Sequence, residues 1–307
     1  MRVLQLDRSR EMRGGQWQAL RLAEALPGLG VESTLLAPAG APLFELARQR
    51  GCRVEPLGLV RIARLARHHD LVHAHDAGSH SLAAAAGALA PSGPLVVSRR
   101  VAFPIGDSVA ARWKYRRASR YIAVSEFVKS VLERGGVPAG AIDVVYDGVP
   151  LLEPAEPAAP SSPPLVLAPE TGGDPLKCAD LARQAARLAG VEIAFSSDLE
   201  RDLPRASLFL YLSRAEGLGS AALVAMSAGV PVIASNLGGL REAVRHEETG
   251  LLVENQPAAI ARAIRSLVDD PETARRLGRA ARQVVGDRFT IDNMARATAA
   301  VYHRVLT

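Results

Sequence analysis

Short apolar runs rich in β-branched residues alternate with segments of helical periodicity along the whole of this chain. The pattern stops once, at residues 150–164, where six prolines exclude a helix or a central strand, and then restarts. Strands that alternate with helices indicate βαβ units and a mostly parallel sheet. The sequence therefore predicts an α/β protein of two domains joined by a proline-rich linker.

The first half is expected to contain strands and helices in strict alternation. The predicted strands are 3–6, 33–37, 71–74, 95–97, 121–124 and 142–145. The predicted helices are 16–26, 43–50, 79–90 and a helix that ends near 134, for which Ser125 is a good N-cap.

The second half repeats the pattern after the linker. Its predicted strands are 165–168, 191–195, 208–212, 230–234 and 251–253. Its predicted helices are 175–189, 220–228, 239–245, 256–269, 271–286 and 290–306. Ligands of open parallel sheets bind beyond the carboxyl ends of the strands, so we expect binding groups in the loops that follow them.

The length of 307 residues suits two domains of ordinary size. No stretch reaches the ~20 apolar residues that cross a bilayer, and the start of the chain becomes charged after six residues, so we expect a cytoplasmic protein. The two cysteines, Cys52 and Cys178, form no CxxC pair and cannot by themselves hold a structural zinc.

Positive charge is concentrated in the first half of the chain. Residues 1–150 carry 20 Lys and Arg against 13 Asp and Glu, whereas residues 151–307 carry 17 against 19. A basic half indicates an anionic partner. Nucleic acid is not the partner we expect, because no recognised nucleic-acid module accompanies the charge and aromatic residues make up only 4% of the chain.

The most informative segment is SRAEGLGSAALVAMSAGVPVIASNLGG at 213–239. Its glycine turn, Glu216-Gly217-Leu218-Gly219, leads into a helix that starts at Ser220. Such a turn lets backbone amides approach a ligand, and the helix presents its positive end to an anion such as a pyrophosphate. Glu216 could accept hydrogen bonds from sugar hydroxyls. Taken alone, the same pattern also fits a tight turn with a solvated glutamate.

With its surroundings, this segment resembles the donor-binding domain of glycosyltransferase family 4. The GGxxE pattern (238–242) and TGLLV (249–253) follow it in order. The first half supplies the glycine pair Gly14-Gly15, DLVHAHDAGSH (70–80), YIAVSEFV (121–128) and IDVVYDGV (142–149). Asp147 stands where the family usually has asparagine.

The resemblance implies a two-Rossmann (GT-B type) protein with domains facing across a cleft. Residues 1–149 would form the acceptor domain, 150–164 the linker, 165–289 the nucleotide-sugar domain and 290–307 a helix packing back on the first domain. It implies transfer of a sugar from a nucleoside-diphosphate sugar to a hydroxyl acceptor, with retained configuration, no metal and no permanently bound cofactor. A role in cell-envelope polysaccharide, lipopolysaccharide or glycolipid assembly would follow.

The resemblance also implies roles for single residues. Lys177 would contact the diphosphate, and Glu216 with the turn 217–219 and Ser220 would hold the sugar. Gly14 and Gly15 would let the acceptor-side loop approach the donor. His75, at a strand end, is a catalytic candidate. The remaining acceptor-side candidates are Asp76, Arg99, Arg100 and Ser125.

Several positions depart from the family pattern. Val224 replaces a glutamate that usually binds the ribose, and the segment LVLAPETGGDPLK, which ends at Lys177, lacks the arginine that the family has shortly before the lysine. Lys177 and Glu216 are only 39 positions apart, and Arg99-Arg100 stands where a histidine is usual. These departures keep a second hypothesis open: a degenerate glycosyltransferase fold that binds a nucleotide or a partner with little transfer activity.

Two further clusters remain open. His73, His75, Asp76 and His80 gather at one strand end, and we do not expect them to hold a metal. His75 could bind the acceptor or the donor, or it could be a structural histidine whose hydrogen bonds are made within the protein. The densest basic stretch comprises Arg112, Trp113, Lys114, Tyr115, Arg116 and Arg117. It could lie on the anionic inner face of a membrane and receive a lipid-linked acceptor, or it could be a solvated helix face.

Overall fold

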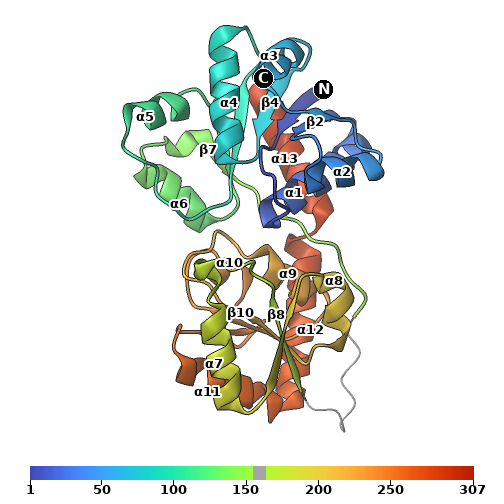
Figure 1. Ribbon diagram of the computed structural model, residues 1–307, viewed down its shortest axis with the longest axis vertical. Coiled ribbons are helices and arrows are strands. Elements are labelled where there is room, and N and C mark those ends of the chain that lie inside the picture. Colours follow the sequence, from blue (N-terminus) through green and yellow to red (C-terminus); the bar gives the residue numbers. More distant parts are fainter. Residues whose placement is uncertain (155–163) are drawn as a thin grey trace. The chain divides into compact units, whose positions relative to one another are not determined.

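A computed structural model of the chain describes residues 1–154 and 164–307 (Figure 1). Most of the predicted linker therefore lies outside the described residues. The chain divides into two compact units. The first comprises Met1–Gly148 and Ile291–Thr307, and the second comprises Val149–Thr290.

The first unit is built on a seven-stranded sheet in which every neighbouring pair is parallel. The strand order is β3-β2-β1-β4-β5-β6-β7, so the chain reverses direction across the sheet between β1 and β4. The strands are β1 (Arg2–Leu6), β2 (Glu32–Ala37), β3 (Val54–Pro56), β4 (Leu71–Ala74), β5 (Leu95–Arg99), β6 (Arg120–Ala123) and β7 (Ile142–Val144).

Helices connect successive strands of this sheet, and a last helix ends the chain. They are α1 (Gly14–Ala25), α2 (Pro42–Gln49), α3 (Leu59–Ala66), α4 (Ala77–Leu89), α5 (Val109–Tyr115), α6 (Glu126–Arg134) and the C-terminal α13 (Ile291–Leu306), with short 3-10 turns η1 (Leu26–Leu29) and η2 (Ala139–Ala141). Figure 1 shows α13 beside α1, and these two helices are in contact.

The core of the first unit joins the sheet to the last helix. Val3, Leu71 and Val96 come from neighbouring strands, and they pack with Met294 and Tyr302 of α13. Both faces of a parallel sheet are covered, which is why its strands are apolar at nearly every position. The helix that ends the chain is therefore part of the fold of the first unit.

The second unit is built on a five-stranded parallel sheet of order β12-β11-β10-β8-β9. Its strands are β8 (Leu165–Pro169), β9 (Glu192–Ser196), β10 (Leu208–Tyr211), β11 (Val232–Ser235) and β12 (Leu251–Val253). The chain runs from β8 outward to β9 and returns to the other side of β8 as β10. A crevice at such a reversal is where ligands bind in open α/β sheets.

The helices of the second unit cover this sheet. They are α7 (Ala179–Ala189), α8 (Leu199–Asp202), α9 (Ser220–Ser227), α10 (Leu240–Ala243), α11 (Pro257–Val268) and α12 (Pro271–Arg288), with 3-10 turns η3 (Pro175–Lys177) and η4 (Leu203–Arg205). Leu208, Leu210 and Ile233 of the strands pack with Ile260 and Ile264 of α11 in its main apolar cluster.

The α/β fold of two parallel sheets confirms the fold class predicted from the sequence. Three short elements were not anticipated: β3, α3 and α8. The basic stretch, for which a solvated helix face was one alternative, lies largely in α5. One expected element was wrong in detail, because the helix predicted for 175–189 is interrupted. Cys178 has φ +50°, which separates η3 from α7. A short turn therefore precedes the helix.

Candidate functional site

A lysine, a glutamate and a tyrosine form a closed triangle of hydrogen bonds in the second unit. Lys177 Nζ lies 2.5 Å from Glu216 Oε2 and 2.9 Å from Tyr211 Oη. The Tyr211 hydroxyl in turn donates to Glu216 Oε2 at 2.8 Å. The structure thus brings together Lys177 and Glu216, the two residues singled out from the sequence, and adds a third.

The topology of the sheet explains why these side chains meet. Lys177 lies in the loop after β8 and Glu216 in the loop after β10, and these strands are neighbours on either side of the reversal point. A backbone hydrogen bond from Arg214 N to Leu176 O, 2.8 Å long, ties the two loops together. The site therefore occupies the crevice position typical of doubly wound sheets.

The loop that carries Lys177 is held by its own backbone. The Asp174 side chain accepts a hydrogen bond from Leu176 N at 3.0 Å, and Lys177 N donates to Asp174 O at 3.0 Å. Cys178 follows in the left-handed region, which is uncommon for a residue with a side chain and frequent at functional sites. The backbone thus fixes the direction in which Lys177 projects.

Tyr211 is a site residue that the sequence reasoning missed. It is the last residue of β10 and is almost fully buried, and Lys177 Nζ also lies 5.0 Å from its ring centroid. Burial, and next the charge of Glu216, raise the pKa of the Tyr211 phenol well above its usual 10. The phenol therefore remains a hydrogen-bond donor at any physiological pH. A polar residue that ends an apolar strand just before the glycine turn was the available signal.

The glycine turn packs against a second glycine pair. A Cβ on Gly239 would lie 1.7 Å from Gly217 O, and Gly239 N donates to Glu216 O at 3.2 Å. Gly219 has φ +99°, and a Cβ there would lie 2.5 Å from the Leu240 side chain. The close approach of the two backbones explains why this segment needs glycine at these positions.

The turn ends at the amino terminus of α9. Gly219 is the N-cap residue and offers no side-chain cap, so the first amides of the helix, from Ser220 onward, have no capping side chain. Leu218 is buried beneath the turn. Val224, which replaces the family glutamate, is also buried, with 6% of its surface exposed. The site thus combines a cation, a carboxylate and a helix amino terminus that favours anions.

In the first unit, two carboxylates bracket the loop that follows β1. The Asp7 carboxylate accepts from Ser9 N at 2.9 Å and from Gln16 Nε2 at 2.9 Å, and it is fully buried. Asp76 Oδ2 accepts from Arg8 N at 2.8 Å. Burial, and next the charge of Asp76, raise the pKa of Asp7 to about 6. Asp7 was not identified from the sequence; a carboxylate directly after a buried strand was the signal.

Asp76 also caps the helix that follows β4. Its Oδ1 accepts from Gly78 N at 2.7 Å and from Ser79 N at 3.0 Å. Gly14 and Gly15 form the first residues of α1 on the other side of the same loop, and a Cβ on Gly15 would lie 3.8 Å from Arg100 Cδ. The predicted donor-side residue Gly15 and the predicted acceptor-side residues Asp76 and Arg100 therefore surround one loop.

His75 belongs to a buried chain of hydrogen bonds. Its Nε2 lies 2.7 Å from Gln5 Oε1 and donates to it, so its Nδ1 lone pair faces Arg100 Nη1 at 3.4 Å. Burial lowers the pKa of His75 well below 6.5, with smaller contributions from His73 and Arg100. The ring is thus neutral, and its one lone pair is directed at a guanidinium. This arrangement positions Arg100.

The other histidines of the predicted cluster also have protein partners. His73 contacts Tyr302 Oη at 2.6 Å and Ser98 Oγ at 2.8 Å, and His80 Nε2 lies 3.1 Å from Lys114 O. Burial lowers the pKa of His73 well below 6.5 and that of His80 to about 4. Over residues 1–154 and 164–307, no group of three or more His, Cys, Asp or Glu side chains is arranged to hold a metal.

Two other acceptor-side candidates have structural partners. Arg99 Nη2 donates to Phe103 O at 2.5 Å, whereas its Nε is buried without a hydrogen-bond partner in the described part of the chain. Ser125 is fully buried and accepts from Val128 N at 3.0 Å, which confirms it as the N-cap of α6.

The basic stretch forms α5, a helix with no buried residue. Its exposed surface carries Val109 and Trp113, which are 75% and 42% exposed. The Arg117 guanidinium lies 5.1 Å from the Trp113 ring centroid. Arg112, Arg116 and Arg117 border a shallow hollow with Val109 and Trp113. We call this the α5 surface.

Two family models match consecutive parts of the chain. The model described as Glycosyltransferase Family 4 matches residues 12–152, and that described as Glycosyl transferases group 1 matches residues 177–284. The first begins at residue 12, near the end of the bracketed loop, and the second begins at Lys177. The chain belongs to the family 4 glycosyltransferases. The departures noted above are therefore variations within that family.

Curated relatives are similar to about a third of the chain. Glycogen synthase of Mycobacterium tuberculosis is 44% identical over 101 residues, which cover 33% of this chain and 24% of the relative. D-inositol 3-phosphate glycosyltransferase of Streptomyces avermitilis is 44% identical over 98 residues, 32% of this chain and 21% of the relative. The matched parts thus span less than a quarter of these proteins.

Solved structures share the fold over the whole chain. Anabaena Alr3699/HepE in complex with UDP superposes with a TM-score of 0.85 at 19% identity, covering 99% of this chain and 100% of that one. The apo form of the lipopolysaccharide outer core galactosyltransferase WaaB gives a TM-score of 0.72 at 14% identity, covering 99% and 100%. Solved chains of about the same extent therefore share this fold.

None of the helices among the described residues has the length and apolar character needed to cross a membrane.

Proposed function

We propose that this protein transfers a sugar from a nucleoside-diphosphate sugar to a hydroxyl acceptor, with retention of configuration. The observation that carries the proposal is the Lys177–Glu216–Tyr211 triangle beside the glycine turn and the start of α9. The family and the names of the relatives support the same reaction class. Anabaena Alr3699/HepE has been solved with UDP and with UDP-glucose, so a UDP-sugar is the first donor to test.

The site offers positive charge where the leaving diphosphate would need it. Transfer breaks the bond between the anomeric carbon and the diphosphate oxygen, and negative charge develops on that oxygen. Lys177 Nζ and the first amides of α9 would stabilise this charge. The acceptor hydroxyl would attack on the face that the diphosphate leaves and pass its proton to the leaving phosphate. Cations of the chain would then perform the role that a metal has in other transferases.

Glu216 would orient the sugar. Its Oε2 is engaged by Lys177 and Tyr211, whereas its Oε1 has no hydrogen bond to the described part of the chain. A carboxylate oxygen accepts hydrogen bonds from sugar hydroxyls, and Tyr211 fixes the carboxylate with a phenol that stays protonated. Interactions that strengthen as the sugar becomes oxocarbenium-like would lower the barrier.

A binding experiment tests the donor site directly. The melting temperature of the full chain is measured with UDP, GDP and ADP in turn. A ligand at 100 times its dissociation constant adds ~2.7 kcal/mol of stability, so at least one nucleotide should raise the melting temperature. Lys177→Met should abolish that rise, and Arg183→Met, on the exposed side of α7, should leave it unchanged. No shift with any nucleotide would contradict the proposal.

A second candidate is a chain that binds the nucleotide but transfers poorly. Val224 favours it, because a buried valine cannot accept hydrogen bonds from a ribose as the family glutamate does. The two candidates differ in turnover: a transferase should hydrolyse its donor slowly even without acceptor, and a binding protein should not.

We further propose that the acceptor is presented at an anionic membrane surface, in cell-envelope polysaccharide or glycolipid assembly. The α5 surface supports this, because it combines exposed apolar side chains with arginines, and such surfaces attract anionic lipids. A lipid-linked acceptor would then reach the first unit from the membrane.

A further inference from the structure

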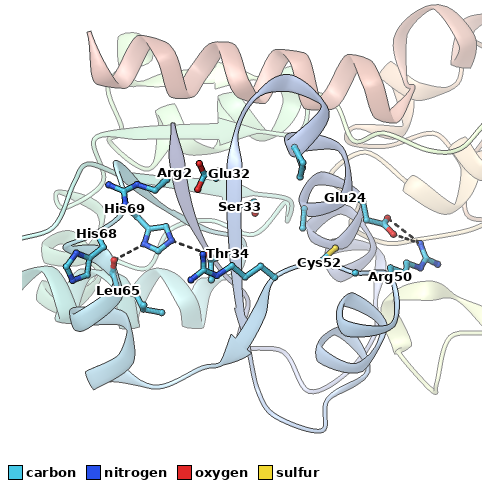
Figure 2. Close-up of a pocket in the computed structure, with 14 residues that line it drawn as sticks. Arg2, Glu24, Glu32, Ser33, Thr34, Arg50, Cys52, Leu65, His68 and His69 are labelled. Carbon is cyan, nitrogen blue, oxygen red and sulfur yellow. Dashed lines mark hydrogen bonds and ion pairs between the residues drawn. The ribbon is translucent and has the colours of Figure 1, made fainter.

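A cavity of about 700 Å³ lies at the amino ends of the strands in the first unit (Figure 2). Arg2 begins β1, Glu32 begins β2, and Arg53 directly precedes β3, and all three line it. The predicted acceptor-side groups lie at the opposite, carboxyl ends of the strands. A five-residue strand is ~16 Å long, so the two places are well separated. The volume is that of a small-molecule site.

The cavity contains cationic groups without acidic partners. Neither the Arg2 nor the Arg53 side chain makes an ion pair within the described ranges, although both line the cavity. Arg50 is different, because its Nη1 lies 3.2 Å from Glu24 Oε1. An arginine presents a planar fork of donors that matches the oxygens of a phosphate. The cavity is thus prepared for an anionic group.

Hydroxyl-binding groups lie around these arginines. Figure 2 shows Arg2 and His69 on one side of the strand that carries Ser33, and Glu24 and Arg50 on the other. His69 is fixed in place, since its Nδ1 donates to Leu65 O at 2.7 Å and its Nε2 lies 3.2 Å from Thr34 Oγ1.

The residues that line the cavity limit the chemical class of ligand that it can bind. Two carboxylates, Glu24 and Glu32, would repel a ligand that carries only negative charge, but they accept hydrogen bonds from alcohols. No Trp, Tyr or Phe lines the cavity, so it lacks the large aromatic rings on which a nucleobase stacks best. A ligand with one phosphate and several hydroxyls satisfies both the arginines and the carboxylates.

We propose that this cavity binds a small phosphorylated sugar or polyol, at a site separate from the donor site of the second unit. Arg2 and Arg53 bind the phosphate. The hydroxyls form hydrogen bonds with four side chains: Glu24, Glu32, Ser33 and Thr34. The proposal does not depend on the transfer reaction, because it concerns another unit of the fold.

Cys52 supplies a local reporter of binding. It lines the cavity and is partly buried, whereas Cys178, the second cysteine of the chain, adjoins Lys177. The wild-type chain is treated with N-ethylmaleimide with and without glucose 6-phosphate, and each cysteine peptide is quantified. Glucose 6-phosphate should slow modification of Cys52 and leave Cys178 unchanged. Protection of Cys178 alone would place the ligand in the donor site and overturn the proposal.

Calorimetric titration measures the affinity and its chemical basis. Replacing Arg2 and Arg53 together by glutamine should weaken glucose 6-phosphate binding about 100-fold or more, since the loss of each charged hydrogen bond weakens binding about tenfold or more. Arg64→Gln, on α3 outside the cavity, is the matched control and should change nothing. Lys177→Met tests the donor site separately and should leave this binding intact.

Two probes separate the parts of the ligand. Glucose without phosphate should bind at least tenfold more weakly than glucose 6-phosphate, because it cannot use the arginines. Equal affinity for inorganic phosphate would contradict the role given to Glu24 and Glu32. Absence of glucose 6-phosphate binding, or binding unaffected by the Arg2 and Arg53 substitutions, would overturn the site.

Discussion

Arg100 and Asp147 form an ion pair inside the first unit, with Nε 3.1 Å from Oδ1 and with only 13% and 8% of the two side chains exposed. Each residue departs from the family pattern, which has a histidine in the region of Arg99-Arg100 and an asparagine at 147. The structure shows that these two departures are coupled. Relative to the family pattern, Arg100 adds a positive charge after β5 and Asp147 adds a negative charge after β7, and the two charges balance.

The pair should therefore respond non-additively to mutation. Arg100→Met leaves the Asp147 carboxylate in a buried place without its cation, and we expect a loss of about 3 kcal/mol in the free energy of unfolding. Adding Asp147→Asn should recover more than half of it. Urea denaturation measures all three variants. Arg48→Met breaks an exposed pair with Glu45 and should cost less than about 1 kcal/mol. Additive losses would refute the coupling.

Asp7 should make stability depend on pH. Its pKa is about 6 in the folded chain and 3.8 in the unfolded chain, so the folded state holds a proton that the unfolded state releases first. Its contribution to stability is therefore full below pH 3.8 and is lost as the pH rises to about 6. Asp7→Asn removes this loss. Between pH 4 and pH 7, the free energy of unfolding of the variant should rise relative to that of the wild type by up to about 3 kcal/mol.

The difference between variant and wild type is the informative quantity, because buried histidines act in the opposite direction. The pKa values of His73, His75 and His80 are lowered on folding, so their contribution is present above pH 6.5 and is lost as the pH falls. Chemical denaturation of both proteins across this range cancels the histidines. A difference that stays constant from pH 4 to pH 7 would count against the shifted pKa of Asp7.

The sequence predicted the sheets well and the polar networks poorly. Apolar runs such as those of β1 and β10 are explicit in the sequence, and so is the glycine turn at 217–219. Tyr211 was missed because it reads as the end of a buried strand, and only the fold brings it to Lys177. The pairing of Arg100 with Asp147 joins positions 47 residues apart, which no local pattern reveals.

The short elements were missed for a related reason. The three residues of β3 are too few for a periodic signal, and α3 and α8 are one or two turns long. Cys178 interrupts a segment whose composition favours a helix throughout, because the loop contacts around Asp174 override local propensity. Tertiary contacts decided these details.

Two glycines of α12 should respond in opposite ways to alanine. A Cβ on Gly278 would lie 2.0 Å from Gly229 O, whereas a Cβ on Gly286 meets nothing within 4 Å. We expect Gly278→Ala to lower the free energy of unfolding by about 3 kcal/mol, because the backbone at Gly229, in the loop between α9 and β11, must move. Gly286→Ala should stabilise the helix by about 0.5–1 kcal/mol. Thermal unfolding measures both, and equal effects would show that α12 packs differently.

The α5 surface should bind anionic vesicles. Reversing Arg116 and Arg117 to glutamate removes the attraction, so sedimentation with phosphatidylglycerol vesicles in low salt should fall to the level seen with phosphatidylcholine. Reversing Arg64 and Arg67, exposed arginines near α3, changes the net charge equally and is the matched control. Trp113→Ala should also weaken vesicle binding, and the size of this loss should depend less on the salt concentration than that of the charge reversal. Vesicle binding that both charge reversals reduce equally would assign it to net charge alone.

Lys177 and Glu216 should separate nucleotide binding from sugar binding. Lys177→Met removes the cation expected at the diphosphate, so affinities for UDP and UDP-glucose should fall together. Glu216→Gln keeps the size of the side chain but weakens its acceptor. It should therefore leave UDP affinity within about threefold and lower kcat/KM for donor hydrolysis by tenfold or more. Calorimetry and a hydrolysis assay measure the two quantities, and Glu272→Gln on α12 serves as the control. If Glu216→Gln reduced stability and kcat/KM in parallel while UDP affinity also fell, the glutamate would be holding Lys177 and Tyr211 in place and would have no direct contact with the sugar.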